Sequence, residues 1–371
     1  MSMKRLVLLG AGHAHVHVLA NLGHKELAGC DITLVSPWHQ QIYSGMVPGL
    51  IAGHYKIDDC VIELADLLAG SQVQWLQRSI VALDSDQQVC QLDDGTHLGY
   101  DLISINTGPV HDRQRLETSM PGARQNALFV RPIEGFVELW PKVCELAQER
   151  NLRVSVIGGG AAGIELACAI AHRLPNCAVT LVSGKDPVAN NYSESVQGRV
   201  RRALRKRRID IIQETVAEIC AGQLRLASGA FLRCDVPVLA VGAQAAPWLE
   251  GSKLALDDNG FIAVDEFQRS TSHTNVFAAG DIASRVDRTG ARSGVYAVRA
   301  GPALSDNLLA ALNGSALQPH RPPAKTLNLL SCGNRYAIGS WGAASAEGRW
   351  VWYLKNLIDR RFIARYRRSG R

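Results

Sequence analysis

The stretch that most constrains this chain runs from Val154 to Glu165, where an apolar segment enters a glycine-rich turn. Residues 154–157 form the continuous run that is typical of a parallel strand buried on both faces. Glycines then allow a tight turn, and residues 164–173 have helical periodicity and several alanines. Because the bare N–H groups at such a helix start bind a pyrophosphate, the stretch predicts a dinucleotide site.

A second copy of this pattern lies at the start of the chain. Leu6–Leu9 predicts a buried strand, residues 10–15 form a glycine turn, and residues 31–35 predict the next parallel strand. His15 occupies the position of the usual third glycine, and Ser36 stands where an acid would bind the adenosine ribose. A serine can still hydrogen-bond a ribose, but more weakly than a carboxylate does.

The choice of nicotinamide donor depends on the residues after the second strand of the later copy. That strand, residues 178–182, is followed by Ser183 where NADH-binding proteins carry an acid, and Lys185 is close by. This charge pattern favours NADPH or indifference between the two donors. Three arginines could assist a 2′-phosphate, but a solvated helix face is the interpretation we favour. They are Arg199, Arg201 and Arg202.

A third signature lies at residues 274–283, where a short apolar strand ends in Gly280-Asp281. We predict a helix start at this point, so that Asp281 accepts hydrogen bonds from a polyol while the helix N-terminus faces phosphate. The alternative is that Asp281 only caps the helix. Two glycine turns elsewhere in the chain favour the cofactor role.

Composition excludes several classes of protein. The 371 residues allow two or three domains, and 47% hydrophobic with 20% charged residues indicates a globular chain. No apolar run approaches the about 18 residues of a membrane span, and the chain begins without a secretory signal, which predicts a cytoplasmic protein. The net charge of +6 comes without a nucleic-acid recognition motif, so we expect no nucleic-acid partner.

Cysteines and histidines give no metal pattern. The nine cysteines are scattered singly without a C-x-x-C pair, which indicates reduced thiols that mostly pack in the core. His13, His15 and His17 alternate along a turn and a helix start, where three imidazoles do not converge on one ion. We therefore predict no metal site.

Four further segments complete the sequence-based prediction. Residues 41–55 indicate a structured loop, residues 113–126 a polar crossing between domains, and residues 134–150 an amphipathic helix. Residues 350–365 predict an apolar-faced helix rich in Trp and Arg, which could lie on an anionic membrane. Packing on its own domain or on the second subunit of a homodimer is the alternative that we favour.

The three signatures together resemble the two-dinucleotide-binding-domain flavoproteins of the pyridine nucleotide–disulfide oxidoreductase superfamily, over about residues 3–310. The resemblance implies an α/β fold with two Rossmann-like three-layer domains, in which the NAD(P)H domain is inserted into the FAD domain. The expected boundaries are 1–118 and 249–318 for the FAD domain, 119–248 for the NAD(P)H domain, and 319–371 for a C-terminal segment.

The resemblance also assigns residues to the cofactors FAD and NADH or NADPH. It implies that Glu165 lies near the flavin–nicotinamide contact, and that Tyr43 and Arg299 line the side of the electron acceptor. The expected cofactor contacts are Gly10, Gly12, His13, Ala14, Ser36, Thr107, Gly108, Gly158, Gly160, Ala161, Gly163, Ser183, Gly280, Asp281 and Val298.

The absence of a cysteine pair after residue 41 points to the branch of type II NADH dehydrogenases and sulfide:quinone reductases. Residues 43–49, 294–299 and 350–365 are similar to the flavoprotein module fused ahead of selenide, water dikinase. The predicted function is hydride transfer from NAD(P)H through FAD to a small-molecule acceptor, with a quinone as one candidate. Two alternatives remain: sulfide or selenide oxidation with Cys168 and Cys332, and a non-catalytic electron-carrier subunit.

Overall fold

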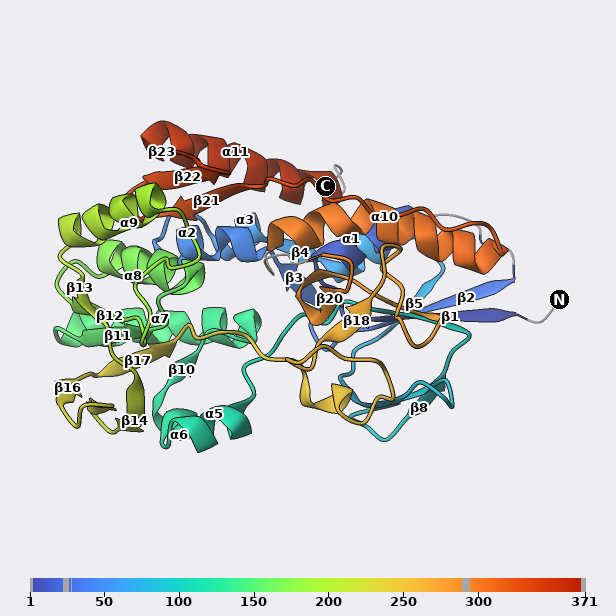
Figure 1. Ribbon diagram of the computed structural model, residues 1–371, viewed down its shortest axis with the longest axis horizontal. Helices are drawn as coiled ribbons and strands as arrows, with labels where there is room; N and C mark the ends of the chain where they lie inside the picture. The colour runs from blue at the N-terminus through green and yellow to red at the C-terminus, as the bar shows by residue number, and fades with distance from the viewer. Residues whose placement is uncertain (1–2, 23–26, 28, 289–293, 368–371) are drawn as a thin grey trace.

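A computed structural model describes residues 3–22, 27, 29–288 and 294–367 of the chain (Figure 1). Two five-stranded parallel sheets form the two halves of the molecule. The first sheet has the order β19-β9-β1-β2-β5, with β19 at Val276–Ala278, β9 at Leu102–Ile105, β1 at Lys4–Leu9, β2 at Cys30–Val35 and β5 at Val73–Leu76. The second has the order β10-β17-β11-β12-β13, with β10 at Leu128–Phe129, β17 at Val236–Leu239, β11 at Arg153–Ile157, β12 at Ala178–Val182 and β13 at Asp210–Ile212.

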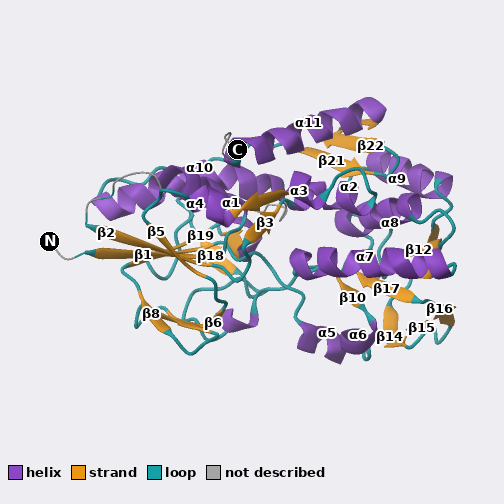
Figure 2. Ribbon diagram, turned by 180° about the vertical axis from the view of Figure 1, so that it is seen from behind, coloured by secondary structure: helices purple, strands orange, loops and turns teal. Residues whose placement is uncertain are grey.

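Each sheet has helices on one face and a small antiparallel sheet near its other side, which gives the three-layer α/β architecture that the sequence predicts (Figures 1 and 2). The first half carries α1 (His13–Leu22) and α10 (Gly294–Asn313), and its antiparallel sheet is β6 (Ile80–Asp84), β7 (Val89–Leu92) and β8 (His97–Gly99). The second half carries α7 (Ile133–Glu149), α8 (Ala161–Arg173) and α9 (Glu194–Lys206), and its antiparallel sheet is β14 (Val216–Cys220), β15 (Gln223–Leu226) and β16 (Phe231–Arg233).

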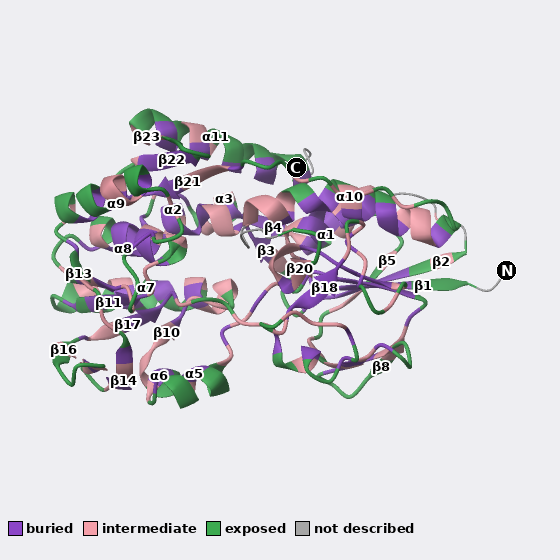
Figure 3. Cartoon of the chain, in the orientation of Figure 1, coloured by how far each residue is buried: buried purple, intermediate pink, exposed green. Residues whose placement is uncertain are grey.

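The C-terminal segment joins the two halves. Its three-stranded sheet contacts α8 and α9, and its long helix contacts α1, α3 (Ile57–Cys60) and β4 (Val61–Glu63) of the first half (Figure 1). The elements are β21 (Leu327–Ser331), β22 (Ala337–Trp341), β23 (Ala344–Gly348) and α11 (Arg349–Tyr366). The inner face of α11 therefore packs on its own chain, as the favoured interpretation of residues 350–365 predicts. Figure 3 shows that much of its outer face is exposed.

Two sequence-based predictions about loops are wrong in detail. Residues 41–55 are not a loop throughout, because they contain the end of β3 (Gln40–Ile42), a 3-10 turn at Ser44–Met46 and α2 (Val47–Ile51), which packs on α8. The polar crossing at 113–126 forms the helices α5 (Arg113–Ser119) and α6 (Ala123–Asn126). Asp112 caps α5 by accepting hydrogen bonds from the N–H groups of Gln114 and Arg115. This cap stabilises the start of α5, although the helix is rich in polar residues.

The Gly-Asp signature also differs from the predicted helix start. Gly280–Ile282 is a single 3-10 turn, and the chain then extends into β20 (Ala283–Arg285), which pairs with β18 (Ile262–Val264). Because this pairing keeps the backbone extended, no α-helix begins at Asp281. The prediction that a helix N-terminus at Asp281 faces phosphate is therefore wrong.

Candidate functional site

A cleft of about 1920 Å³ separates the two halves and is closed at one end by the C-terminal segment. The turns that follow β1, β2, β11 and β12 line it, as expected for a ligand site at the carboxyl ends of parallel strands. Twelve of the fifteen predicted cofactor contacts lie on its wall. Ala14, Gly163 and Gly280 do not: Ala14 donates its N–H to Asn106 Oδ1, Gly163 lies against Gly158 O, and Gly280 lines a separate, smaller cavity.

The first glycine turn is shaped by close backbone approaches. Gly10 has φ +83°, and a Cβ there would meet Thr107 Cα at 2.6 Å, while a Cβ on Gly12 would collide with Asn106. Asn106 stabilises this turn through its side-chain amide. Its Oδ1 accepts hydrogen bonds from the N–H groups of Ala14 and His15, and its Nδ2 donates to Ala279 O at 2.5 Å. The uncovered cradle beside α1 therefore fits a pyrophosphate of FAD.

The three early histidines have separate roles. Burial lowers the pKa of His15 to about 4, and its neutral ring bonds Gly10 O at 2.6 Å and Ser104 Oγ at 2.8 Å. It is thus a structural replacement for the third glycine. His13 faces the cleft and pairs with Ser44 Oγ at 3.2 Å, and His17 pairs with Tyr366 Oη at 3.1 Å. The imidazoles do not converge on one point.

The second glycine turn has a matching geometry. Gly158 has φ +133°, and a Cβ on Gly163 would collide with Gly158 O, so that glycine lets α8 approach β11 closely. A Cβ on Gly160, by contrast, would meet no atom within 4 Å. Gly160 therefore presents its backbone to open cleft at the start of α8, which fits the pyrophosphate of NAD(P)H.

Sequence analysis missed Arg131, which lies on the cleft wall after β10. Its Nη2 lies 4.0 Å from Asp281 Oδ2. Arg131, between β10 and α7, therefore brings a positive charge beside the Gly-Asp signature. Burial lowers the pKa of Arg131, while Asp281 and Glu134 oppose that shift. No motif in the sequence signals this residue, because only the fold brings it beside Asp281.

Glu165 lies on α8 at the cleft wall, and its place near the flavin–nicotinamide contact stays a prediction. Burial raises the pKa of its carboxyl to about 7, although Lys355 and the N–H of Ser331 oppose the shift. Its Oε1 accepts the Ser331 N–H at 2.7 Å, which fixes it against β21. A carboxyl with this pKa can hold or release a proton near neutral pH.

The helix α11 adds a buried ion pair to the same end of the cleft. Lys355 Nζ lies 2.7 Å from Asp359 Oδ2 and donates to Gly45 O at 2.5 Å, and the two side chains are 11% and 6% exposed. Tyr43 lies beside them, with its ring stacked on Phe362 at 4.3 Å. Burial, and then Asp359, raise the pKa of Tyr43. Sequence analysis predicted Tyr43 here but missed Lys355 and Asp359.

Arg299, the third predicted catalytic residue, is exposed on α10 and lines the cleft. In the described part of the chain, no hydrogen bond or ion pair joins it to Glu165, Tyr43 or Lys355. The site near α11 therefore rests on the other residues.

The two cysteines of the sulfur alternative are adjacent rather than isolated. Cys168 on α8 and Cys332 after β21 are both fully buried in one core cluster. A hydrogen bond from Cys168, and then burial, raise the pKa of Cys332 well above its ordinary value. A buried thiol with a raised pKa, such as that of Cys332, is a poor nucleophile, which argues against its use in sulfide oxidation.

The charged residues near the carboxyl end of β12 are not arranged as the sequence suggests. Arg199 and Arg202 bind Glu347 of β23 at 2.8 and 3.1 Å, so both are committed to the C-terminal sheet. Asp186 and Glu214 line the cleft at this end of the second sheet, whereas Lys185 is not on its wall.

Comparison with known proteins agrees with this geometry. The sequence profile of the pyridine nucleotide-disulphide oxidoreductases matches residues 4–301. The chain belongs to this family. The ferredoxin–NAD(+) reductase component of the p-cumate 2,3-dioxygenase system of Pseudomonas putida is 30% identical over 293 residues, which are 76% of this chain and 68% of that one. A demethylphylloquinone reductase of Synechocystis is 25% identical over 300 residues, 77% of this chain and 73% of that one.

The fold also matches beyond the family profile. The structure of NDH2 from Plasmodium falciparum in complex with NADH superimposes with a TM-score of 0.83 at 14% identity, over 98% of this chain and 97% of that one. The match therefore includes the C-terminal segment. As a pyridine nucleotide-disulphide oxidoreductase, the protein is an FAD-dependent NAD(P)H oxidoreductase, which confirms the predicted cofactors, fold class and branch.

Proposed function

We propose that this oxidoreductase takes electrons from NADH and delivers them to a small quinone at the end of the cleft beneath α11. The observation that carries the proposal is the chamber beside Tyr43, where α11 places the buried Lys355–Asp359 pair. A quinone site needs apolar side chains and a few groups that transfer protons, and this end of the cleft has Ile358 beside Tyr43 and Lys355 on its wall. The demethylphylloquinone reductase relative supports the acceptor class.

FAD, when bound, accepts a hydride from nicotinamide and passes the electrons to the acceptor. The chain holds the two dinucleotides at its glycine turns, with Gly10 and Gly12 at one and Gly158 and Gly160 at the other. Glu165 holds or releases a proton at its carboxyl near neutral pH. Lys355, fixed by Asp359 and Gly45 O, presents its Nζ as a hydrogen-bond donor at the acceptor end.

We assign NADH as the donor because of the charges at the second strand end. Asp186 and Glu214 on the cleft wall would repel a 2′-phosphate, and Arg199 and Arg202 are already paired with Glu347. This reverses the leaning towards NADPH that Ser183 and Lys185 give in the sequence.

We also propose that the outer face of α11 lies on an anionic membrane surface, where a quinone is available. Its exposed side chains are apolar or aromatic and are followed by cations, as in interfacial helices. The apolar ones on α11 are Trp350, Tyr353, Leu357 and Ile358, with Trp341 of the neighbouring strand β22 also exposed, and the cations are Arg349, Arg361 and Arg365. No helix in the described part of the chain is long and apolar enough to span a bilayer.

A ferredoxin is the competing acceptor, since the relative with 30% identity is a ferredoxin reductase. The two are separated by NADH oxidation by the FAD-loaded protein with either a soluble naphthoquinone or a plant-type ferredoxin. The proposal predicts fast turnover with the quinone and little with ferredoxin. The reverse result would assign a protein acceptor and refute the chamber as the acceptor site.

A further inference from the structure

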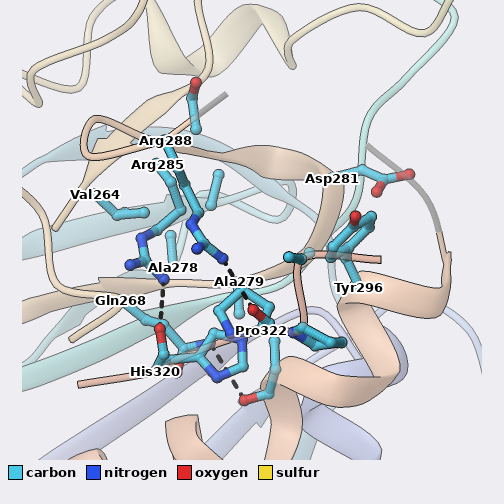
Figure 4. Close-up of a pocket in the computed structure, with 16 residues that line it drawn as sticks. Val264, Gln268, Ala278, Ala279, Asp281, Arg285, Arg288, Tyr296, His320 and Pro322 are labelled. Carbon is cyan, nitrogen blue, oxygen red and sulfur yellow. Dashed lines mark hydrogen bonds between the residues drawn. The ribbon is translucent and has the colours of Figure 1, made fainter. Parts of the chain in front are cut away.

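A second cavity, of about 430 Å³, lies between β18, β20, α10 and residues 320–324 (Figure 4). Asp281 and Tyr296 line both this cavity and the cofactor cleft, so they form part of the wall between the two. Its volume falls in the range of small-molecule sites. The cavity has no role in the proposed transfer from NADH to a quinone.

Gln268 gives the cavity an unsatisfied acceptor. Its side chain is on the cavity wall, only 3% of the residue is exposed, and its Nε2 donates to Ala300 O at 3.2 Å. Its Oε1 is buried without a hydrogen-bond partner. Leaving such an oxygen unpaired is unfavourable, and an N–H or O–H group in the cavity would remove that cost.

The backbone of Gln268 keeps this amide in place. The residue has φ +65°, a conformation that is uncommon for a side-chain-bearing residue. Its N–H donates to Asp265 O at 3.1 Å, and its carbonyl accepts the Ala278 N–H at 2.9 Å. Residues held in such conformations cluster at ligand sites, so the strain is a second indication of a functional position.

The arginines make the cavity wall positive, since the carboxylate of Asp281 on that wall is paired with Arg131 of the cofactor cleft at 4.0 Å. Arg285 is neutralised by Asp287, with two contacts of 2.8 Å. Arg288 donates to Pro322 O at 3.2 Å and has no carboxylate partner within the described ranges. Burial, and then the two arginines, lower the pKa of His320, so this imidazole adds no charge at neutral pH. Among the described residues, the Arg288 guanidinium therefore forms no ion pair with a carboxylate.

We propose that this cavity binds a small organic anion that also carries an N–H or O–H donor. Arg288 binds the carboxylate or phosphate of the ligand, because a guanidinium matches either anion. Gln268 Oε1 accepts the hydrogen bond of the donor group. Figure 4 shows Arg288 and Gln268 among the residues that surround the cavity.

The test is calorimetric titration of the FAD-loaded protein with citrate and with glycerol 3-phosphate, each of which carries an anion and a hydroxyl. Arg288→Gln is expected to weaken binding about tenfold or more, equivalent to about 1.4 kcal/mol, because the charged contact is lost. The matched control is Arg233→Gln, which removes an exposed arginine of β16 far from the cavity lining and is expected to leave binding unchanged. Binding of only one probe identifies the anion as carboxylate or phosphate.

A second variant tests the donor contact separately. Gln268→Leu is expected to weaken the hydroxyl-bearing probe several-fold while inorganic phosphate, which is also titrated, keeps its affinity for Arg288. The proposal is refuted if neither probe binds saturably to the wild-type protein, or if Arg288→Gln binds as tightly as Arg233→Gln. Because no readout uses NADH or a quinone, these results are independent of the proposed function.

Discussion

At the scale of single residues, Glu165 is a buried carboxyl whose protonation state changes near neutral pH. Its pKa is raised from 4.5 to about 7 by burial, so its ionisation is less favourable in the folded protein than in the unfolded chain. The stability that this carboxyl allows is fully present below about pH 4.5 and is lost as the pH rises through 7. Glu165 therefore links both stability and proton transfer to neutral pH.

Glu165→Gln should remove this linkage. We expect urea unfolding to show that the wild-type protein loses at most about 3 kcal/mol between pH 5 and pH 8 through this group, and that the variant loses correspondingly less. In steady-state turnover with NADH and a quinone, the wild-type pH profile should bend near pH 7 and the variant profile should not. An unchanged bend in Glu165→Gln would assign it to another group.

The glycines of the second turn separate a structural role from a binding role. Gly160→Ala adds a Cβ with no atom within 4 Å, so the variant should fold normally but bind NADH at least tenfold more weakly, because the methyl group occupies the pyrophosphate cradle. Gly163→Ala places its Cβ against Gly158 O and should lower the melting temperature instead. Thermal unfolding and NADH titration measure both effects. Equal melting losses in the two variants would contradict this division of roles.

At the scale of elements, α11 contributes side chains that the sequence did not identify. Lys355→Met leaves Asp359 buried without its cation, which should cost about 3–5 kcal/mol in urea unfolding. The double variant Lys355→Met, Asp359→Leu removes both charges and should recover most of that stability. Quinone turnover should stay low in both. Recovery of turnover together with stability would mean that the pair is only structural.

The outer face of α11 is tested by co-sedimentation with lipid vesicles. We expect the FAD-loaded protein to bind vesicles that contain phosphatidylglycerol and to be released by salt, because its cations are exposed. A variant with Trp350→Ser and Leu357→Ser should bind much less, since both side chains are about half exposed or more. A protein that ignores vesicles but is a dimer, reduced to a monomer in this variant, would assign the face to a second copy.

The sequence predicts some elements well and others poorly, for physical reasons. The buried strands β1, β2, β11 and β12 are mostly apolar runs, and β1 and β11 lead into glycine turns, a local pattern that indicates the sheet and its carboxyl edge. The Gly-Asp turn was misread as a helix start because the pairing of β20 with β18 is a tertiary contact. Asn106, Arg131 and Lys355 meet partners far along the chain, which no local pattern reveals.

At the scale of the whole molecule, the two nucleotide-binding halves and the C-terminal segment share parts of their cores. Val47 and Ile51 of α2 and Ile338 of β22 belong to the same hydrophobic cluster as the residues of α8. The C-terminal segment therefore packs against both halves, at the end of the cleft where we propose that the acceptor binds. In the proposed function, donor and acceptor bind at different parts of this one cleft.

The most direct test of this account is the flavin absorbance of the purified protein without oxygen, as NADH or NADPH is added. We predict that NADH bleaches the flavin rapidly and that NADPH does so at least tenfold more slowly, because Asp186 and Glu214 line the nucleotide end of the cleft. Bleaching by NADPH alone would contradict the assignment of the donor. Bleaching by sulfide or selenide, with none by either nucleotide, would contradict the central claim and return the chemistry to Cys168 and Cys332.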